Sequence, residues 1–221
     1  MTSSLCFDLF ETLVTVPQSD AYPPEREILG LDWDTWIAAT QTEEQYFRRG
    51  SGLVREPAAI IREMIAACGR TATPAQEQEM LRRRVARFCA ALKEPLPEIL
   101  DTLRTLRQRG HRLCLVSNAD AIDVFHWRDS PLRPLFDEVI FSYEVGAVKP
   151  HAEIYLLAAE RLGVRPEDCV FIGDGGQDEL AGAKRTGMRT VLARHFFIRE
   201  GVEADAVVER FGELAGVLAR W

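Results

Sequence analysis

The chain has 221 residues, of which 47% are hydrophobic and 28% are charged, and its formal net charge is −7. This length suits one domain, or one domain with a modest insertion, and the hydrophobic content excludes a disordered chain. An acidic chain is a poor match for nucleic acid or an anionic membrane surface. No run approaches the roughly 18 apolar residues of a membrane span, and no basic segment precedes a long apolar run as in a signal peptide.

The cysteines are odd in number and show no CxxC spacing, so we expect free thiols that pack as small hydrophobic groups. They are Cys6, Cys68, Cys89, Cys114 and Cys169. A protein without disulfides is typical of a reducing compartment, and we expect a cytoplasmic location.

Short apolar runs alternate with longer helical patterns along most of the chain. The runs cover residues 5–10, 112–117, 138–141, 169–173 and 190–193. They are apolar throughout, which is typical of parallel strands that are buried on both faces. Helical patterns follow at residues 97–110, 151–163, 178–186 and 209–219. This alternation predicts βαβ units and a doubly wound, Rossmann-like α/β fold.

One stretch breaks this alternation. Between the first and second runs the pattern predicts only helices, at residues 34–48, 56–68 and 74–92, with a flexible break at 50–52. An insertion directly after the first strand lies over the carboxyl end of the sheet, where ligands bind in open α/β folds. We therefore expect a core domain of residues 1–13 and 93–221, and a helical cap domain of residues 14–92 that acts as a lid.

Polar residues follow the first two strands. Asp8 ends the first run, and a carboxylate at that edge can act as a nucleophile that forms a covalent aspartyl intermediate. Ser117 and Asn118 end the second run, where a hydroxyl and backbone N–H groups can hold phosphoryl or carboxylate oxygens. Each feature also has an ordinary structural explanation, because Asp, Ser and Asn commonly cap turns and helices.

Charged residues follow two later segments. Lys149 precedes a helix that Pro150 can begin, and an ammonium there would neutralise Asp8 and an incoming anion together. Asp174, Asp178 and Glu179 follow a buried strand beside two glycines, and crowded carboxylates without His or Cys suit Mg²⁺. An acidic helix start alone would explain Asp178 and Glu179, but it explains Asp174 less well. Because all these groups end at one sheet edge, their joint order predicts a single site.

The order of these motifs resembles that of the haloacid dehalogenase (HAD) superfamily, whose members hydrolyse substrates with an aspartate nucleophile. The segment 7–13 (FDLFETL) resembles the first family motif, and Ser117-Asn118 resembles the second. Lys149-Pro150 resembles the third, and residues 173–188 resemble the acidic fourth. The helical insertion is similar to the family's type 1 cap.

The resemblance implies a role for each matching residue. Asp8 would be the nucleophile, and Ser117 and Lys149 would hold the transferring group. Mg²⁺ would bind Asp8, Asp174 and the backbone carbonyl of Phe10. Either Asp178 or Glu179 would complete the acid cluster, and both are kept as metal-site candidates. Asn118 and Thr12, from the second and first motifs, are expected to contact a small anionic substrate.

One position departs from the family pattern. Family phosphatases carry a second Asp two residues after the nucleophile, as general acid for the leaving group, and here that residue is Phe10. Glu11 is one residue further and should point away from Asp8 on an extended strand. The acid cluster favours a metal-dependent phosphatase. Phe10 favours either a metal-independent 2-haloacid dehalogenase or a phosphatase whose substrate has a good leaving group. A non-catalytic domain that binds a phosphorylated ligand is the third alternative.

Arginines in the cap are candidates for substrate contacts. Arg48 and Arg55, with Arg49, flank the 50–52 break and could bind a second anionic group. An ordinary solvated face is the alternative, since residues 82–84 (Arg-Arg-Arg) are equally basic with no evident task. Trp33 and Trp36 are expected in the cap core rather than against a ligand. Monomer and homodimer remain equally open.

Overall fold

The computed structural model describes residues 4–221 and contains one sheet of six parallel strands in the order β3-β2-β1-β4-β5-β6. The strands are β1 (Ser4–Phe7), β2 (Arg112–Ser117), β3 (Glu138–Phe141), β4 (Cys169–Gly173), β5 (Arg189–Ala193) and β6 (Ala206–Val208). The chain adds strands first on one side of β1 and then on the other. The predicted doubly wound α/β fold is therefore confirmed, and its crevice lies beyond the carboxyl ends of β1, β2 and β4.

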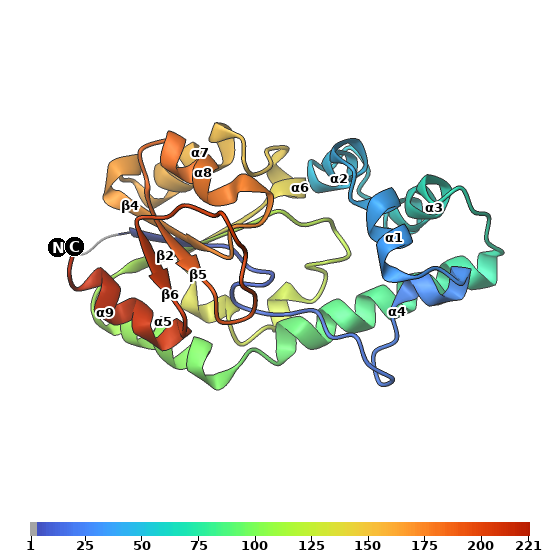
Figure 1. Cartoon of the computed structure of the whole chain (residues 1–221), viewed down its shortest axis with the longest axis horizontal. Helices are drawn as coiled ribbons and strands as arrows, with labels where there is room; N and C mark the ends of the chain where they lie inside the picture. The colour runs from blue at the N-terminus through green and yellow to red at the C-terminus, as the bar shows by residue number, and fades with distance from the viewer. Residues whose placement is uncertain (1–3) are drawn as a thin grey trace.

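Helices cover both faces of this sheet. In Figure 1, α7 and α8 lie above the sheet, α5 and α9 lie below it, and the C-terminus lies at the far left. These helices and the short α6 are α5 (Pro97–Gln108), α6 (Ser142–Val145), α7 (Ala152–Leu162), α8 (Glu179–Arg185) and α9 (Leu214–Leu218).

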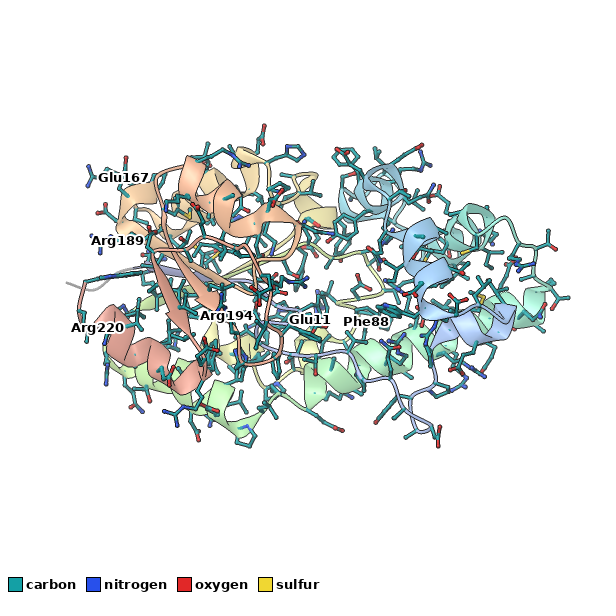
Figure 2. All side chains as sticks on the ribbon, viewed as in Figure 1. Glu11, Phe88, Glu167, Arg189, Arg194 and Arg220 are labelled. Carbon is teal, nitrogen blue, oxygen red and sulfur yellow. The ribbon has the colours of Figure 1, made fainter. Side chains whose placement is uncertain are left out.

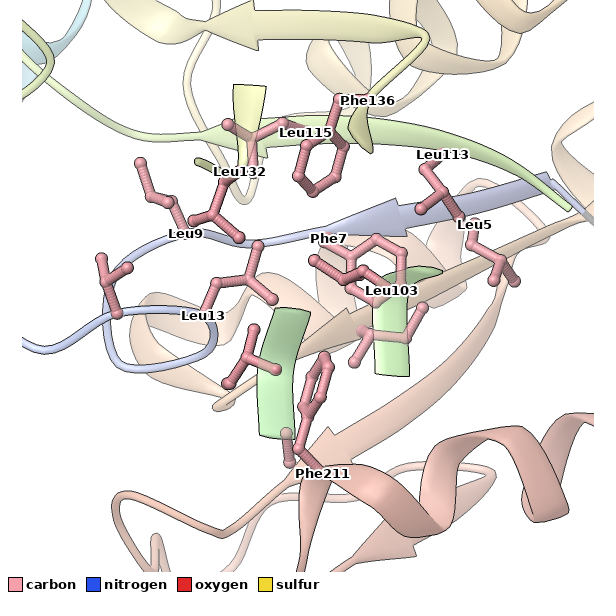
Figure 3. Packing of buried hydrophobic residues seen from close by; sticks show 14 of the residues in the cluster. Leu5, Phe7, Leu9, Leu13, Leu103, Leu113, Leu115, Leu132, Phe136 and Phe211 are labelled. Atoms are coloured by element: carbon pink, nitrogen blue, oxygen red, sulfur yellow. The ribbon is translucent and has the colours of Figure 1, made fainter. Parts of the chain in front are cut away.

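The central strand shows why its sequence is apolar without alternation. Phe7 faces the side of α5 and α9, where it packs with Leu103 and Phe211 (Figure 3), and its ring centroid lies 6.2 Å from that of Phe211. Cys6 faces the opposite side and belongs to the cluster under α7 and α8, with Ile154 among its members. Successive side chains of a strand point to opposite faces, so both faces of β1 are buried.

The segment between β1 and β2 forms the helical cap. Its helices are α1 (Trp33–Thr40), α2 (Glu43–Gly50), α3 (Pro57–Ala67) and α4 (Pro74–Lys93). Figure 1 shows them beyond the end of the sheet that is opposite the C-terminus, with α4 reaching back beneath the core. A separate hydrophobic cluster that includes Trp36, Ile61 and Met80 holds them together. The predicted helical insertion after the first strand is confirmed.

Two predictions for the cap are wrong. The single helix expected at 34–48 is two helices, because the Thr42 side chain accepts a 3.3 Å hydrogen bond from the backbone N–H of Gln45 and begins α2. The break at 50–52 is a close contact rather than a flexible joint. Gly52 has φ +74°, and a Cβ there would lie 2.1 Å from the backbone oxygen of Tyr143 in the core.

Two element boundaries also differ from the prediction, and one strand was not predicted. β1 ends at Phe7, and the chain then turns, with the Leu13 N–H donating a 2.8 Å hydrogen bond to the Leu9 carbonyl. β6 was not predicted, because three residues of half-exposed edge strand carry too little pattern. The last helix begins at Leu214. Within residues 4–221, no helix combines the length and apolar character needed to cross a membrane.

Candidate active site

Asp8 lies where β1 ends, and the sheet holds its backbone. Its N–H donates a 2.9 Å hydrogen bond to the Ile172 carbonyl of β4, which continues the parallel ladder. The Thr12 hydroxyl donates a 3.1 Å hydrogen bond to Oδ2 of Asp8, and Lys149 Nζ donates to Oδ1. Asp8 is only 6% exposed, and burial raises the pKa of its carboxyl, with Lys149 opposing the shift. Both carboxylate oxygens are therefore oriented by fixed donors.

Lys149 joins the first motif to the fourth. Besides its contact with Asp8, its Nζ donates a 2.6 Å hydrogen bond to Oε2 of Glu179. Burial acts to lower the pKa of Lys149, but the carboxylates of Asp8 and Glu179 raise it above its ordinary value. Burial raises the pKa of Glu179 to about 8, with Lys149 acting in the opposite direction. The ammonium is thus held in its charged form at the base of the site.

Asn118 fixes the segment that carries Lys149. Its Nδ2 donates to the Lys149 carbonyl and its Oδ1 accepts from the Lys149 N–H, each at 2.8 Å. This pair of hydrogen bonds makes Asn118 a positioning residue for the lysine backbone, while its side chain also lines the cavity described below. Ser117 is fully buried, and its Oγ lies 3.5 Å from the Asn118 carbonyl oxygen. It is not among the residues that line the cavity.

Three carboxylates meet beside Asp8. Asp8, Asp174 and Glu179 are buried, and each offers an oxygen such that all three lie within 4.8 Å of one another. Asp178, the other candidate, is exposed and has φ +56°, so the turn before α8 directs its side chain out of the cluster. The structure therefore brings Glu179, not Asp178, to the acid cluster. An oxygen-only donor set of this kind fits a hard divalent cation.

Asp174 is already paired with a cation. Arg199, in the loop between β5 and β6, donates from Nε to Oδ2 of Asp174 at 2.7 Å, and its Nη2 lies 2.7 Å from the same oxygen. Arg199 was not predicted as a site residue, because nothing in the local sequence pattern indicates that this loop returns over the site.

Glu11 contradicts the expectation that it points away from Asp8. The backbone at Glu11 has φ +63°, so the chain has left the extended conformation that the expectation assumed. Glu11 lines the same cavity as Asp8, and Figure 2 shows it with Phe88 at the junction of sheet and cap. Burial, and then the negative charges of Asp174 and Asp8, raise the pKa of Glu11 to about 7. Its Oε2 is buried without a hydrogen-bond partner among the described residues.

A cavity of about 380 Å³ lies between the sheet edge and the cap. Its floor is formed by Asp8, Lys149 and Asp174, and its walls by cap residues and by the loop after β1. The ring of Phe10 lines it and packs edge-on against Phe88, with centroids 5.2 Å apart. Cap residues and Asp8 thus line the same cavity, and the action of the cap as a lid stays a prediction.

The structure does not bring Arg48 and Arg55 to this cavity. Arg48 forms a 2.7 Å ion pair with Glu63, and Arg55 donates to the Gly52 carbonyl at 3.0 Å. Neither residue lines the cavity. The helix that carries Arg48 turns the adjacent Arg49 inward instead, because successive helical residues differ by about 100° in direction.

The arginines that do reach the cavity belong to a buried ionic network. Arg84 of α4 lies 3.2 Å from Glu25, 3.1 Å from Asp120 and 2.5 Å from Asp123. Arg87 also pairs with Glu25, at 2.6 Å. Arg84 had no evident task in the sequence, yet it ties the cap to the loop that follows β2. Arg84 has this role because α4 docks against the core, which the local sequence does not reveal.

Comparisons with known proteins agree with this geometry. The family model of the haloacid dehalogenase-like hydrolases matches residues 3–186. The chain is 37% identical over 107 residues to a glyceraldehyde 3-phosphate phosphatase of Methanopyrus kandleri, covering 47% of this chain and 45% of that enzyme. It is 33% identical over 155 residues to a phosphoglycolate phosphatase of Salmonella choleraesuis, covering 66% and 61%. The chain thus spans about half the length of the former relative and three fifths of the latter.

Solved structures share the fold across nearly the whole chain. An L-2-haloacid dehalogenase superposes with a TM-score of 0.71 at 20% identity and covers 99% of both chains. A HAD family enzyme of Bacteroides thetaiotaomicron, solved with magnesium and inorganic phosphate, superposes with a TM-score of 0.60 at 20% identity, covering 92% of this chain and 97% of that one. The family match over most of the chain shows that this protein belongs to the haloacid dehalogenase-like hydrolases.

Proposed function

We propose that the protein is a Mg²⁺-dependent phosphatase that acts on a small phosphorylated metabolite through an aspartyl-phosphate intermediate at Asp8. The observation that carries the proposal is the meeting of Asp8, Asp174 and Glu179 within 4.8 Å, beside the ammonium of Lys149. Three buried carboxylates face two cationic side chains, Lys149 and Arg199, so the formal charge of the cluster is still negative, and a divalent cation would relieve it. A metal-independent dehalogenase has little use for so dense a cluster of acids.

The residues present fit a magnesium site. The donors are all oxygens, and Asp8, Asp174, Glu179 and the carbonyl of Phe10 would hold the ion. Bound there, Mg²⁺ would supply positive charge against the phosphoryl oxygens. The two sequence relatives, a glyceraldehyde 3-phosphate phosphatase and a phosphoglycolate phosphatase, support a small phosphorylated metabolite as the substrate class of this chain. We also propose residues 1–13 and 93–221 as the core domain and residues 14–92 as the cap domain.

The chain's own residues account for the two chemical steps. In the first, a carboxylate oxygen of Asp8 forms a bond to phosphorus, and the bond from phosphorus to the leaving oxygen breaks with its electron pair on that oxygen. In the second, water attacks the phosphorus, inorganic phosphate departs and the Asp8 carboxylate is restored. Lys149, held charged between Asp8 and Glu179, stabilises the oxygens of the transferring group.

Hydrolysis of p-nitrophenyl phosphate, with and without Mg²⁺, tests the proposal. We expect turnover that requires Mg²⁺ and that falls by at least about 10³-fold in Asp8→Asn, because the amide is not a nucleophile. Asp101→Asn, an exposed residue of α5 that does not line the cavity, is the matched control and should retain full activity. Turnover without metal, or turnover that survives in Asp8→Asn, would contradict the proposal.

The second candidate is a metal-independent 2-haloacid dehalogenase, and Phe10 is the observation that favours it. An aromatic ring stands two residues after Asp8, where a carboxylic acid would serve a phosphatase, and halide needs no proton to leave. Chloride release from 2-chloropropionate in the presence of a metal chelator tests this candidate. Failure of both assays would favour a non-catalytic domain that binds a phosphorylated ligand.

A further inference from the structure

Part of the cavity lining is aromatic. Five aromatic side chains line the cavity: Phe10, Trp33, Trp36, Tyr46 and Phe88. Phe10 comes from the loop after β1, and the other four come from three cap helices. Aromatic rings bury large areas and prefer edge or offset contact with another ring.

Trp33 and Trp36 play different parts in this lining. Trp36 is 4% exposed and is also a member of the cap core, as the sequence suggested. Trp33, which was expected in the cap core, is instead 46% exposed and lines the cavity, and the Arg26 guanidinium carbon lies over its ring, 5.3 Å from the centroid. A large aromatic residue left half open beside a cavity is typical of a surface that binds a ligand.

The cationic side chains that line the cavity are all paired already, so none is free to bind a second anionic group. Five cationic and six acidic side chains line the cavity. Each cation has a carboxylate partner: Arg49 pairs with Asp120, Arg84 with Asp123, Arg87 with Glu25, Lys149 with Asp8, and Arg199 with Asp174. A divalent ion at the acid cluster would balance one phosphoryl group. A substrate with an additional carboxylate would therefore find no unpaired cation in the lining.

We propose that the leaving group of the natural substrate is an uncharged aromatic group, bound against Trp33 and Phe88, so that the substrate is an aryl phosphate. This inference rests on the proposed phosphatase activity and names its substrate class. A phenol has a pKa of about 10, like the tyrosine side chain. Its oxygen can depart with the electron pair of the phosphorus–oxygen bond and take a proton from water afterwards. The ring of Phe10 in place of an acid is compatible with such a leaving group.

Binding of phosphonates, which cannot be hydrolysed, tests the inference independently of catalysis. The probes are phenylphosphonate, propylphosphonate and phosphonoacetate, titrated into the Mg²⁺-loaded protein by calorimetry. We expect phenylphosphonate to bind about tenfold more tightly than the other two, because only its ring can use the aromatic lining. Equal affinities, or tightest binding of phosphonoacetate, would overturn the inference.

Single substitutions test which aromatic side chains bind the ring of phenylphosphonate. Trp33→Ala and Phe88→Leu should each weaken phenylphosphonate binding by about fivefold and leave propylphosphonate binding within twofold. Phe47→Ala removes an aromatic residue of α2 that is 40% exposed and does not line the cavity, so it should change neither affinity. Because Trp33 is half exposed, its substitution should not unfold the cap. Unchanged phenylphosphonate binding in Trp33→Ala would contradict the assignment.

Hydrolysis separates this inference from the proposed function. Rapid Mg²⁺-dependent turnover of phosphoglycolate, together with slow turnover of phenyl phosphate, would uphold the phosphatase and overturn the aryl leaving group. Selective binding of phenylphosphonate without hydrolysis of any phosphate ester would do the reverse: it would uphold the aromatic site and overturn the phosphatase.

Discussion

Arg199 holds Asp174 through its Nε, which donates a 2.7 Å hydrogen bond to Oδ2, and through its Nη2, which lies 2.7 Å from the same oxygen. The guanidinium thereby occupies an oxygen of the acid cluster that we propose for Mg²⁺. Arginine and a divalent cation would therefore act on the same carboxylate, and the arginine already offsets part of its negative charge.

Removal of Arg199 should tighten Mg²⁺ binding. In Arg199→Ala the Asp174 carboxylate loses its competing cation, and we expect a dissociation constant for Mg²⁺ lower by about two- to fivefold, as suits a partly exposed pair. Isothermal calorimetry of the metal-free protein measures it. Arg165→Ala, which breaks an exposed pair with Asp168, is the control and should not change the constant. Weaker binding in Arg199→Ala would mean that the arginine supports the metal site.

Loss of Arg84 should strongly destabilise the protein. Arg84→Ala leaves the buried carboxylates of Glu25, Asp120 and Asp123 short of a partner, and we expect a loss of about 3–5 kcal/mol in the free energy of unfolding. Arg82→Ala on the same helix is the control, because its side chain is 66% exposed. Urea denaturation of both variants measures the difference. Equal, small losses would show that the network contributes little.

Glu25 should make stability depend on acid pH. Burial acts to raise the pKa of Glu25, but Arg84 and Arg87 lower it below its ordinary value of 4.5. A carboxyl with a lowered folded-state pKa contributes stability above its unfolded pKa, and this contribution is lost as pH falls through the folded value. At pH 7 we expect Glu25→Gln to be less stable than wild type by about 3 kcal/mol.

The stability difference between wild type and Glu25→Gln should shrink as the pH is lowered from about 5 toward 3, and chemical denaturation at several pH values measures it. Glu27→Gln, two residues away and with its side chain 54% exposed, is the control. It should show a small difference with no such trend. A Glu25→Gln deficit that stays constant on acidification would contradict the ionic role of Glu25.

Gly52 should tolerate no side chain. Gly52→Ala combines a left-handed backbone with a Cβ placed 2.1 Å from the Tyr143 oxygen, so the contact between cap and core must open. Gly69→Ala is a matched control, because Gly69 has φ +62° and open space around it. We expect a loss of about 1–2 kcal/mol for Gly69→Ala, from the backbone alone, and a larger loss for Gly52→Ala. Thermal unfolding compares them, and equal losses would exclude the steric effect.

The core and the floor of the site could be predicted from the sequence. Runs that are apolar throughout identify parallel strands, and each of five predicted runs contains a strand of the sheet. Because parallel strands present their carboxyl ends at one edge, Asp8 and Asp174 were expected at the same edge, and the pairing of β1 with β4 makes them neighbours. Lys149 was assigned to the same site because Lys149-Pro150 resembles the third family motif. These relationships depend on local patterns and topology, which the sequence carries directly.

The turn before α8 and the loop after β1 could not be predicted at the same level. The choice between Asp178 and Glu179 depended on positive φ values in the turn, and Glu11 reached the cavity through a left-handed residue. Neither conformation has a pattern in a single sequence, since both residues are ordinary acids that are rarely found there.

The sequence by itself determined the α/β core, the helical insertion and the family motifs with their order. Only the tertiary structure decided which cap side chains enclose the site. Arg82, Arg83 and Arg84 show the reason: their side chains are 66%, 23% and 7% exposed. Three identical neighbours on a helix differ in direction by about 100° each, and the docking of that helix alone selects the one that is buried.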